Sequence, residues 1–274
     1  MTDSPASSAP IAPDMPAPGS ILTRCAAATH VGKVRTTNED SLLAQHPIFL
    51  IADGVGGHNA GEVASAFVVE EFRRLVGQPN VEVEQLAGTL RAAADRVNAI
   101  EPDDSEGPAA GTTVALVATT VVDGNGYWVV LNLGDSRVYR LTSGGLEQVS
   151  VDHSVVQELL DQGLISSERA RHHPYRHMIT RALGAGHDAE PDCWLIPAQV
   201  GDRLLICSDG LTDEVRDEAL EDVLQTQPDL DSAAQTCVDL ALQAGGHDNV
   251  SVVIVQAVDI VGAQHHSEDG ESQP

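Results

Sequence analysis

The sequence has few cysteines and few aromatic residues, which limits the kinds of architecture it can form. Its four cysteines, Cys25, Cys193, Cys207 and Cys237, lie far apart in the 274-residue chain and include no C-x-x-C pair. That spacing argues against a zinc site or a disulfide framework and is typical of reduced thiols in a cytosol. Aromatic residues make up 3% of the chain, whereas hydrophobic residues make up 42%. We therefore expect a sizeable core built from Val, Leu, Ile and Ala.

Positive charge is also scarce, because 15 Lys and Arg residues face 41 Asp and Glu residues, giving a formal net charge of −26. This excess would repel nucleic-acid phosphates and anionic membranes, so neither partner is expected. The chain has no apolar run of about 18 residues. It also lacks a basic, apolar leader at its N-terminus. These absences predict a soluble, cytoplasmic protein, which we expect to be a monomer. Most of the acidity would serve solubility, while some carboxylates could be clustered to hold cations.

One continuous pattern fills residues 21–258 and predicts a single domain. Residues 1–20 are rich in Pro, Ala and Ser, and residues 259–274 form an acidic, polar end. Both ends are predicted to be disordered tails. Short β-branched runs inside the domain predict strands. The predicted strands are 22–28, 48–52, 112–122, 127–131, 138–141, 203–207 and 250–258.

Two amphipathic helices are predicted between the second and third of these strands. The first starts near Ala60 and repeats apolar residues from Ala64 to Val76, and the second repeats them from Leu86 to Ile100. Shorter helices are predicted at 155–161, 217–224 and 231–242, with Ser154 or Asp152 capping the first. The dipeptides Asp-Gly and Asn-Gly in "VVDGNGYWVV" predict a hairpin. Two consecutive helices followed by hairpin-linked strands predict antiparallel sheets flanked by helices, an α+β layered fold.

Several phosphate-binding motifs are excluded by spacing. The only Gly-Lys pair, Gly32-Lys33, lacks the upstream glycine of a Walker loop, and the glycines at 54, 56, 57 and 61 do not satisfy G-x-G-x-x-G. No cysteine is followed by Arg six residues later, so cysteine-dependent phosphatase chemistry is excluded as well.

Four aspartates stand at the ends of apolar runs: Asp53 in "FLIADG", Asp135 in "VVLNLGDSR", Asp209 in "LLICSDG" and Asp248 in "GGHDNVSVVIV". One Asp-Gly pair after a strand is usually a turn, but four such positions are harder to attribute to turns alone. In antiparallel sheets, the end of one strand and the start of its neighbour share an edge, so these carboxylates can converge. A convergent group repels itself unless cations neutralise it. Ligands that are all oxygen favour Mg²⁺ or Mn²⁺ over zinc.

Two such ions, about 4 Å apart, would deprotonate a bridging water and hold a phosphoryl group for in-line attack. The remaining negative charge of the phosphate calls for an arginine. Arg35, in "GKVRTTNED", is the best candidate because it precedes another polar turn.

Seven stretches of the sequence together resemble the metal-dependent PPM/PP2C-type serine/threonine protein phosphatases, particularly the bacterial members. They occur in family order and cover roughly residues 21–258. The stretches are "VRTTNEDS" (34–41), "IADGVGGHNAGEVAS" (51–65), "GTTVAL" (111–116), "NLGDSRVYR" (132–140), "ITRALG" (179–184), "CSDGLTD" (207–213) and "GGHDNVSVVIV" (245–255). The resemblance implies a four-layer α-β-β-α sandwich with a dinuclear Mn²⁺/Mg²⁺ site at one edge of two antiparallel sheets.

The resemblance also implies a role for each matching residue. Asp53 would bridge both ions, the Gly54 carbonyl would bind one, and Asp209 and Asp248 would complete the protein ligands. Glu39 resembles the carboxylate that holds a metal-bound water, and Arg35 resembles the phosphate-binding arginine. A weaker third metal ion would be held by Asp135 with Asp209 and, less directly, Asp213. The catalytic set is therefore Arg35, Asp53 and Asp209.

The chain departs from the eukaryotic members of the family at one histidine position. Eukaryotic relatives have histidine directly after the Asp-Gly pair, proposed as the acid for the leaving alkoxide, but here that position is Val55, as in bacterial members. The general acid is then unassigned, with His58 and a metal-bound water as candidates. We interpret His172, His173 and His177 as a solvated or substrate-facing surface, because the carboxylates already supply the ligands.

The sequence thus predicts an Mn²⁺- or Mg²⁺-dependent enzyme that hydrolyses phosphoserine and phosphothreonine in proteins by attack of a metal-bridging hydroxide. Its partners would be phosphorylated proteins, including a Ser/Thr protein kinase and that kinase's substrates. One alternative is a non-catalytic domain of the same fold, which the complete set of carboxylates disfavours. Another is a phosphohydrolase of the HD or haloacid-dehalogenase type. The His-Asp pairs at 187 and 247 lack an all-helical context, and "DLDSA" at 229 follows no strand.

Overall fold

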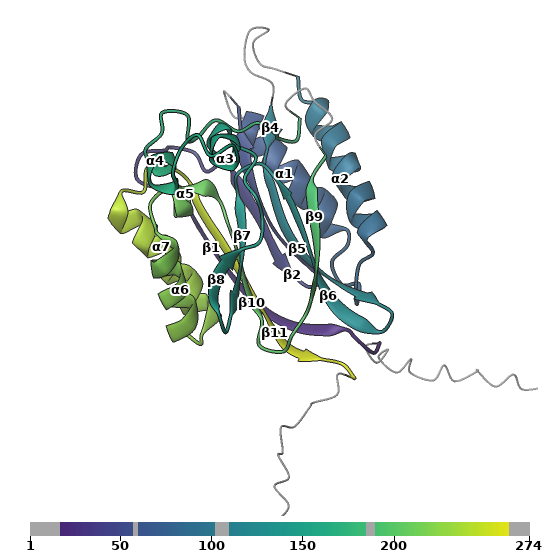
Figure 1. The fold of residues 1–274 in the computed structure, drawn as a ribbon. Coiled ribbons are helices and arrows are strands. Elements are labelled where there is room, and N and C mark those ends of the chain that lie inside the picture. The colour runs from purple at the N-terminus through teal and green to yellow at the C-terminus, as the bar shows by residue number, and fades with distance from the viewer. Residues whose placement is uncertain (1–16, 57–59, 102–109, 185–189, 263–274) are drawn as a thin grey trace, which may run out of the picture.

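The computed structural model describes residues 17–56, 60–101, 110–184 and 190–262. In these residues the chain forms two antiparallel sheets that pack face to face, with helices on both outer faces (Figure 1). One sheet has the strand order β1 (Ile21–His30), β11 (Val250–Ile260), β10 (Arg203–Cys207), β7 (Arg137–Thr142) and β8 (Gly145–Gln148). The other has the order β2 (Asp40–Gln45), β3 (Ile48–Val55), β5 (Val114–Val122), β6 (Asn125–Leu133) and β9 (Asp192–Pro197), and β4 (Gly111–Thr112) pairs with β3. The predicted α-β-β-α sandwich is confirmed.

The helices divide between the two outer faces and one end of the sheets. Helices α1 (Ala60–Arg73) and α2 (Val83–Asn98) cover the sheet that contains β3. Helices α6 (Asp217–Thr226) and α7 (Leu230–Ala244) cover the sheet that contains β10. Three short helices, α3 (Val155–Asp161), α4 (Ser167–Arg171) and α5 (Asp209–Thr212), lie near β4 at one end of the sandwich (Figure 1). Within the described part of the chain, no helix is both long and apolar enough to cross a membrane.

Strand β3 shows how the layers are joined. Its side chains alternate between two cores, because successive residues of a strand point to opposite faces. Ile48 and Leu50 belong to the core under α1 and α2, whereas Phe49 and Ile51 belong to the core between the sheets. All four side chains are completely buried. A strand buried on both faces has little freedom to shift, so its end is a rigid platform for functional groups.

A buried ionic network connects the two sheets at the end of the sandwich that contains the β9–β10 turn. Asp202, in that turn, accepts hydrogen bonds from the Arg140 guanidinium of β7 at 2.9 Å and from the Trp128 indole of β6 at 3.0 Å. The backbone N–H of Gln199 also donates to Asp202, at 2.8 Å. Since β6 and β7 belong to different sheets, Asp202 holds the two layers together with its carboxylate fully satisfied.

Most of the predicted elements are confirmed. Ser154 caps α3, since its Oγ accepts from the backbone N–H of Gln157 at 3.2 Å. The predicted hairpin joins β5 to β6, with positive φ at Asp123 and Gly124, as a type I′ turn requires.

Some elements were predicted wrongly or missed. The single strand predicted for 112–122 is divided at Thr113 into β4 and β5, and the predicted strand 250–258 extends to Ile260. The sequence analysis missed β2, β8 and β9, three of the four edge strands of the two described sheets, whereas the fourth, β1, was predicted; it also missed α4 and α5. Of the predicted tails, residues 1–16 and 263–274 lie outside the described residues.

We expect Asp202→Ala to destabilise the fold strongly, because it leaves the buried Arg140 charge and the Trp128 N–H without their partner. The expected loss in the free energy of unfolding is about 3–5 kcal/mol, the usual cost of removing one partner of a buried ion pair. Urea denaturation would measure it. Asp222→Ala, on the exposed face of α6, is the control and should change stability by less than about 0.5 kcal/mol. Equal stability of the two variants would show that the network does not hold the sheets together.

Candidate active site

The four aspartates predicted at strand ends lie on segments that reach one end of the sandwich. Asp53 lies near the C-terminal end of β3, and Asp135 lies in the turn between β6 and β7. Asp209 begins α5 just after β10, and Asp248 lies two residues before β11. The negative charges of Asp209, Asp135 and Asp248 all act on the Asp53 carboxyl. The structure therefore brings the predicted carboxylates together.

Burial and the repulsion of neighbouring carboxylates make the carboxyl groups of Asp53 and Asp135 hard to ionise. Burial is the main reason that the pKa of Asp53 lies well above its usual value, and the neighbouring carboxylates raise it further. Burial also raises the pKa of Asp135 well above the usual range, followed by the charge of Asp209. The same cause, burial, raises the pKa of Glu39. A cation bound among these groups would remove the repulsion.

Asp40 belongs to this group, and the sequence analysis did not assign it a role. It pairs with Asp53 across β2 and β3, and the Ser208 hydroxyl donates to its Oδ2 at 2.9 Å. Its Oδ1 is buried and has no hydrogen-bond partner among the described residues. Burial raises the pKa of Asp40 to about 7, although hydrogen bonds from Ser251 and Ser208 oppose the shift. The available signal was weak, because "DSLLAQ" contains only a short apolar run, Leu42 to Ala44, and no alternation that marks a strand beginning at Asp40.

The backbone around Asp53 is fixed by the two threonines of "GTTVAL". The N–H of Thr113 donates to the Asp53 carbonyl at 2.8 Å, and the Thr112 hydroxyl donates to the same carbonyl at 2.9 Å. In return, the N–H of Asp53 donates to the Thr113 hydroxyl oxygen at 3.0 Å. This exchange interrupts the ladder at Thr113 and explains why the predicted strand is divided there.

Two glycines allow the surrounding backbones to pack closely. The N–H of Gly54 donates to the Glu39 carbonyl at 3.2 Å, and a Cβ added to Gly54 would lie 2.3 Å from the Gly61 carbonyl oxygen. A Cβ added to Gly210 would lie 2.0 Å from the Asn249 carbonyl oxygen. Both contacts are too short for any side chain, so each Asp-Gly pair requires its glycine for packing.

Asn249, another residue that the sequence analysis did not single out, holds the loop that carries Arg35 and Glu39. Its side-chain amide donates to the carbonyls of Val31 and Thr37 at 2.9 and 3.0 Å, and its Oδ1 accepts from the Glu39 N–H at 2.8 Å. Arg35 then reaches the site, donating to Asp248 Oδ2 at 2.7 Å. Its side chain is 52% exposed, so it can also face a ligand in solvent.

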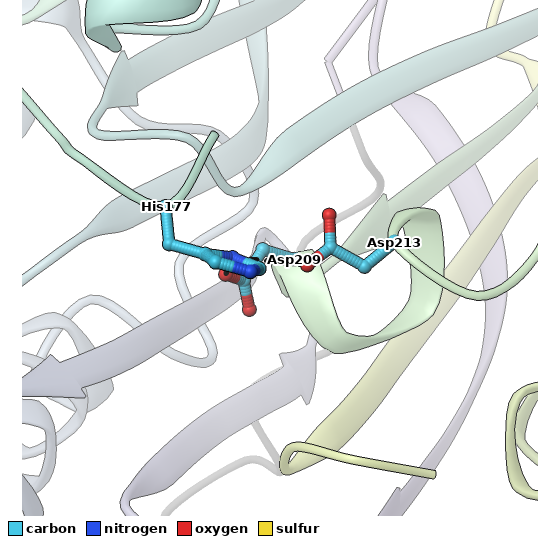
Figure 2. A group of neighbouring side chains, drawn as sticks. All are labelled: His177, Asp209 and Asp213. Carbon is cyan, nitrogen blue, oxygen red and sulfur yellow. Dashed lines mark ion pairs between the residues drawn. The ribbon is translucent and has the colours of Figure 1, made fainter. Parts of the chain in front are cut away.

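His177 is exposed, as predicted, and it also lies beside two carboxylates of the candidate site. His177 lies with its Nδ1 3.1 Å from Asp213 Oδ2 and 3.9 Å from Asp209 Oδ2. Figure 2 shows the ring beside both carboxylates, which come from the α5 turn. The carboxylates of Asp209 and Asp213 raise the pKa of His177. His172 is exposed, as predicted, and His58 lies outside the described residues.

The donor set fits hard divalent cations. It offers carboxylate oxygens from Asp53, Asp209 and Asp248 and a nearby backbone carbonyl at Gly54, with Asp40 contributing a buried oxygen that lacks a hydrogen bond. Oxygen ligands of this kind suit Mg²⁺ and Mn²⁺. No cysteine belongs to this donor set.

Comparisons with known proteins agree on one family. The sequence profile described as Protein phosphatase 2C matches residues 30–244. The serine/threonine protein phosphatase PstP of Mycobacterium tuberculosis is 41% identical over 244 residues, which cover 87% of this chain and 46% of PstP. This chain thus spans about half the length of that relative. The serine/threonine phosphatase stp of Listeria welshimeri is 36% identical over 237 residues, covering 83% of this chain and 93% of stp.

A solved structure of a relative is also closely similar. The catalytic domain of PstP in complex with two manganese ions has a TM-score of 0.79 and 37% sequence identity, and the match covers 87% of this chain and 100% of that domain.

We expect Asp53→Asn to stabilise the metal-free protein, because it removes a charge that burial and four neighbouring carboxylates oppose. In EDTA the Tm should rise by about 2–4 °C, which corresponds to about 1 kcal/mol for a domain of this size. Mn²⁺ should raise the Tm of the wild-type protein but have little effect on Asp53→Asn. Differential scanning calorimetry with and without Mn²⁺ measures both effects, and Asp222→Asn is the surface control. A lower Tm for Asp53→Asn in EDTA would contradict the repulsion.

Proposed function

The chain belongs to the protein phosphatase 2C family, and from this we propose that it hydrolyses phosphoserine and phosphothreonine in proteins with the help of Mn²⁺ or Mg²⁺. The observation that carries the proposal is the convergence of carboxylates from β3, the β6–β7 turn, α5 and the loop before β11, among which burial raises the pKa values of Asp53 and Asp135 well above their usual range. Such a group is costly to the fold and is explained by bound divalent ions.

In this proposal Asp53, Asp209, Asp248 and the Gly54 carbonyl would hold the divalent ions. Ions bound there would supply an activated water for attack on phosphorus and would offset the charge of the phosphoryl group. The pairing of Asp40 with Asp53 places a further carboxyl group where it can accept a hydrogen bond from a water at the site. Glu39, whose backbone is held by Asn249, is proposed for a similar role.

Arg35 is proposed to bind the phosphate. In the structure it pairs with Asp248 on an exposed loop, and a phosphate oxygen, like a carboxylate oxygen, is a charged acceptor suited to a guanidinium. The P–O bond to the serine or threonine breaks as the bond to water oxygen forms, and the leaving alkoxide needs a proton. Val55 cannot supply that proton. Two candidates for the general acid therefore remain from the sequence: His58 and a water molecule at the site.

The proposed partners are phosphorylated proteins, including a Ser/Thr protein kinase and the proteins that it modifies. This follows from the names of the relatives, which are serine/threonine phosphatases. A non-catalytic binding domain is the second candidate, but each of the carboxylates that the chemistry needs is present at the site.

Hydrolysis of a phosphothreonine peptide tests the proposed activity. We expect phosphate release with Mn²⁺ and no release in EDTA. Asp209→Asn should lower kcat/KM by at least about 100-fold, because loss of even an outer partner of a metal ligand commonly costs 10- to 100-fold. Asp222→Asn should retain full activity. Release of phosphate that survives both EDTA and Asp209→Asn would rule out the metal-dependent mechanism, and no release under any condition would favour the binding domain.

Replacement of Arg35 should act on substrate binding. We expect Arg35→Ala to raise KM for the phosphopeptide by about 10-fold or more, because a hydrogen bond to a charged group contributes about 1.5–3 kcal/mol. Stability should change by less than about 1 kcal/mol, since the Arg35–Asp248 pair is exposed.

Lys33→Ala is the matched control for charge, because Lys33 is exposed on the same loop and forms no ion pair with a described residue. Steady-state kinetics on both variants separates the two effects. An equal rise in KM for Lys33→Ala would mean that the loop acts only through its overall charge.

A further inference from the structure

A buried histidine, His153, forms hydrogen bonds with both backbone polar groups of one glycine in the β6–β7 turn. The N–H of His153 donates to the Gly134 carbonyl at 2.9 Å, and the N–H of Gly134 donates to His153 Nδ1 at 3.1 Å. The Asn132 amide is a second donor to the same carbonyl, at 3.1 Å. Gly134 lies between the two strands, directly before Asp135, and His153 is only 6% exposed. The Gly134 N–H therefore relies on a side-chain acceptor that water cannot easily replace.

The residue before this histidine holds the other side of the same turn. The Asp152 carboxylate accepts from Arg137 Nη2 at 2.6 Å and from Arg137 Nε at 3.0 Å. Arg137 is the first residue of β7, whereas Gly134 directly follows β6. Asp152 and His153 therefore hold the chain on both sides of Asp135.

The turn also packs against the threonine that fixes the Asp53 backbone. A Cβ added to Gly134 would lie 2.6 Å from Thr113 Cγ2, and the hydroxyl oxygens of Ser136 and Thr113 are 2.8 Å apart. Thr113 in turn exchanges backbone and side-chain hydrogen bonds with Asp53. A shift of the turn would therefore move Thr113 and, with it, Asp53.

The other ring nitrogen fixes the orientation of the histidine. Because Nδ1 accepts from the Gly134 N–H, the proton of the neutral ring lies on Nε2, which donates to Asp192 Oδ2 at 3.2 Å. Arg181 Nη1 lies 3.3 Å from Nε2, but it also donates to Asp192 Oδ1 at 3.3 Å. The half-exposed Arg181 thus has another acceptor, whereas the Gly134 N–H has only the ring among the described residues. The Nε2–H tautomer satisfies both groups.

We propose that His153 is a positioning residue of the candidate active site, whose Nδ1 fixes the β6–β7 turn and thereby sets Asp135 and, through Thr113, Asp53. The residue acts through the backbone of the turn. What the site requires at this position is then a hydrogen-bond acceptor where Nδ1 lies, more than bulk or charge. The kinetic part of the test rests on the proposed phosphatase function, whereas the tautomer of the ring does not.

Two amide replacements separate the two sides of the ring. His153→Asn places its amide oxygen near the position of Nδ1, whereas His153→Gln places its amide near Nε2 and leaves the Gly134 N–H without an acceptor. With a phosphothreonine peptide and saturating Mn²⁺, His153→Gln should lower kcat about 10- to 100-fold, the usual effect of losing a group that orients a metal ligand. KM should change by less than about 2-fold, because the loss falls on the chemical step. His153→Asn should restore most of kcat.

His46→Gln is the matched control for the loss of a hydrogen-bonded histidine. His46 lies just before β3, at the end of that strand opposite Asp53. Its Nδ1 is 3.2 Å from the Thr23 hydroxyl, and its Nε2 is 3.1 Å from the Pro79 carbonyl. The control variant should have a lower Tm and an unchanged kcat. If His153→Gln likewise lost stability but kept its kcat, the histidine would have only a structural role and the proposal would be overturned.

Titration calorimetry with Mn²⁺ alone provides a readout that needs no substrate. We expect Mn²⁺ affinity to fall about 10-fold in His153→Gln and to stay near the wild-type value in His153→Asn. Equal losses in the two variants would contradict the role of Nδ1. If the wild type bound Mn²⁺ but released no phosphate, the proposed function would fail, and these affinities would still support or overturn the positioning role.

Nuclear magnetic resonance of the metal-free, full-length protein tests the geometry directly. The long-range ¹H–¹⁵N spectrum of a neutral histidine ring distinguishes its two tautomers, and a ¹⁵N–¹⁵N coupling across the hydrogen bond connects a backbone amide to the ring nitrogen that accepts from it. We expect the Nε2–H tautomer of His153 and a coupling between its Nδ1 and the Gly134 nitrogen. An Nδ1–H tautomer would overturn the proposal, because that nitrogen would then have no lone pair for the turn.

Discussion

Carboxylates held together at a buried sheet edge repel one another, and burial removes the water that would otherwise stabilise their charge. Around Asp53 this repulsion comes from four neighbouring aspartates on different segments. Such a group opposes folding, so the surrounding structure has to impose it. The threonines that fix the Asp53 backbone, the glycines that allow close packing and the Asn249 side chain that holds the Arg35 loop all serve this purpose. A cation that binds among these carboxylates relieves their repulsion, and this relief favours its binding.

The rigidity that holds the group comes from strands that are buried on both faces, and these were the strands easiest to predict. Continuous apolar runs such as 48–52 and 203–207 correspond to β3 and β10, which lie inside the sheets. The missed strands β2, β8 and β9 are edge strands. Each has one neighbour and a more polar sequence, so its local pattern is weak, and its existence depends on pairing with a strand from elsewhere in the chain.

The residues of the site, like the strands, divide into those that a local sequence pattern reveals and those that only tertiary packing brings in. Asp53, Asp209 and Asp248 could be identified because each stands where an apolar run ends or begins, a purely local signal. The contribution of Asp40 depends on its register opposite Asp53, and register is not visible in a single strand. The sequence predicted an exposed His177 but not its position beside Asp213, because that position is set by the return of a loop segment to α5. Local pattern predicts which residues carry the chemistry, and tertiary packing decides which others join them.

The overall acidity of the chain gives the cations a second role. With a net charge of −26, the protein repels an anionic substrate, and the carboxylates of the site are only a small part of that charge. A phosphate group that binds Arg35 would also lie near the negative charges of Asp248 and Glu39, which act on the guanidinium. Divalent ions bound at the sheet edge would reverse the local field while leaving the rest of the surface negative. On this reasoning, metal binding admits the phosphate to the site as well as activating the water that attacks it, so loss of metal should weaken substrate binding and chemistry together.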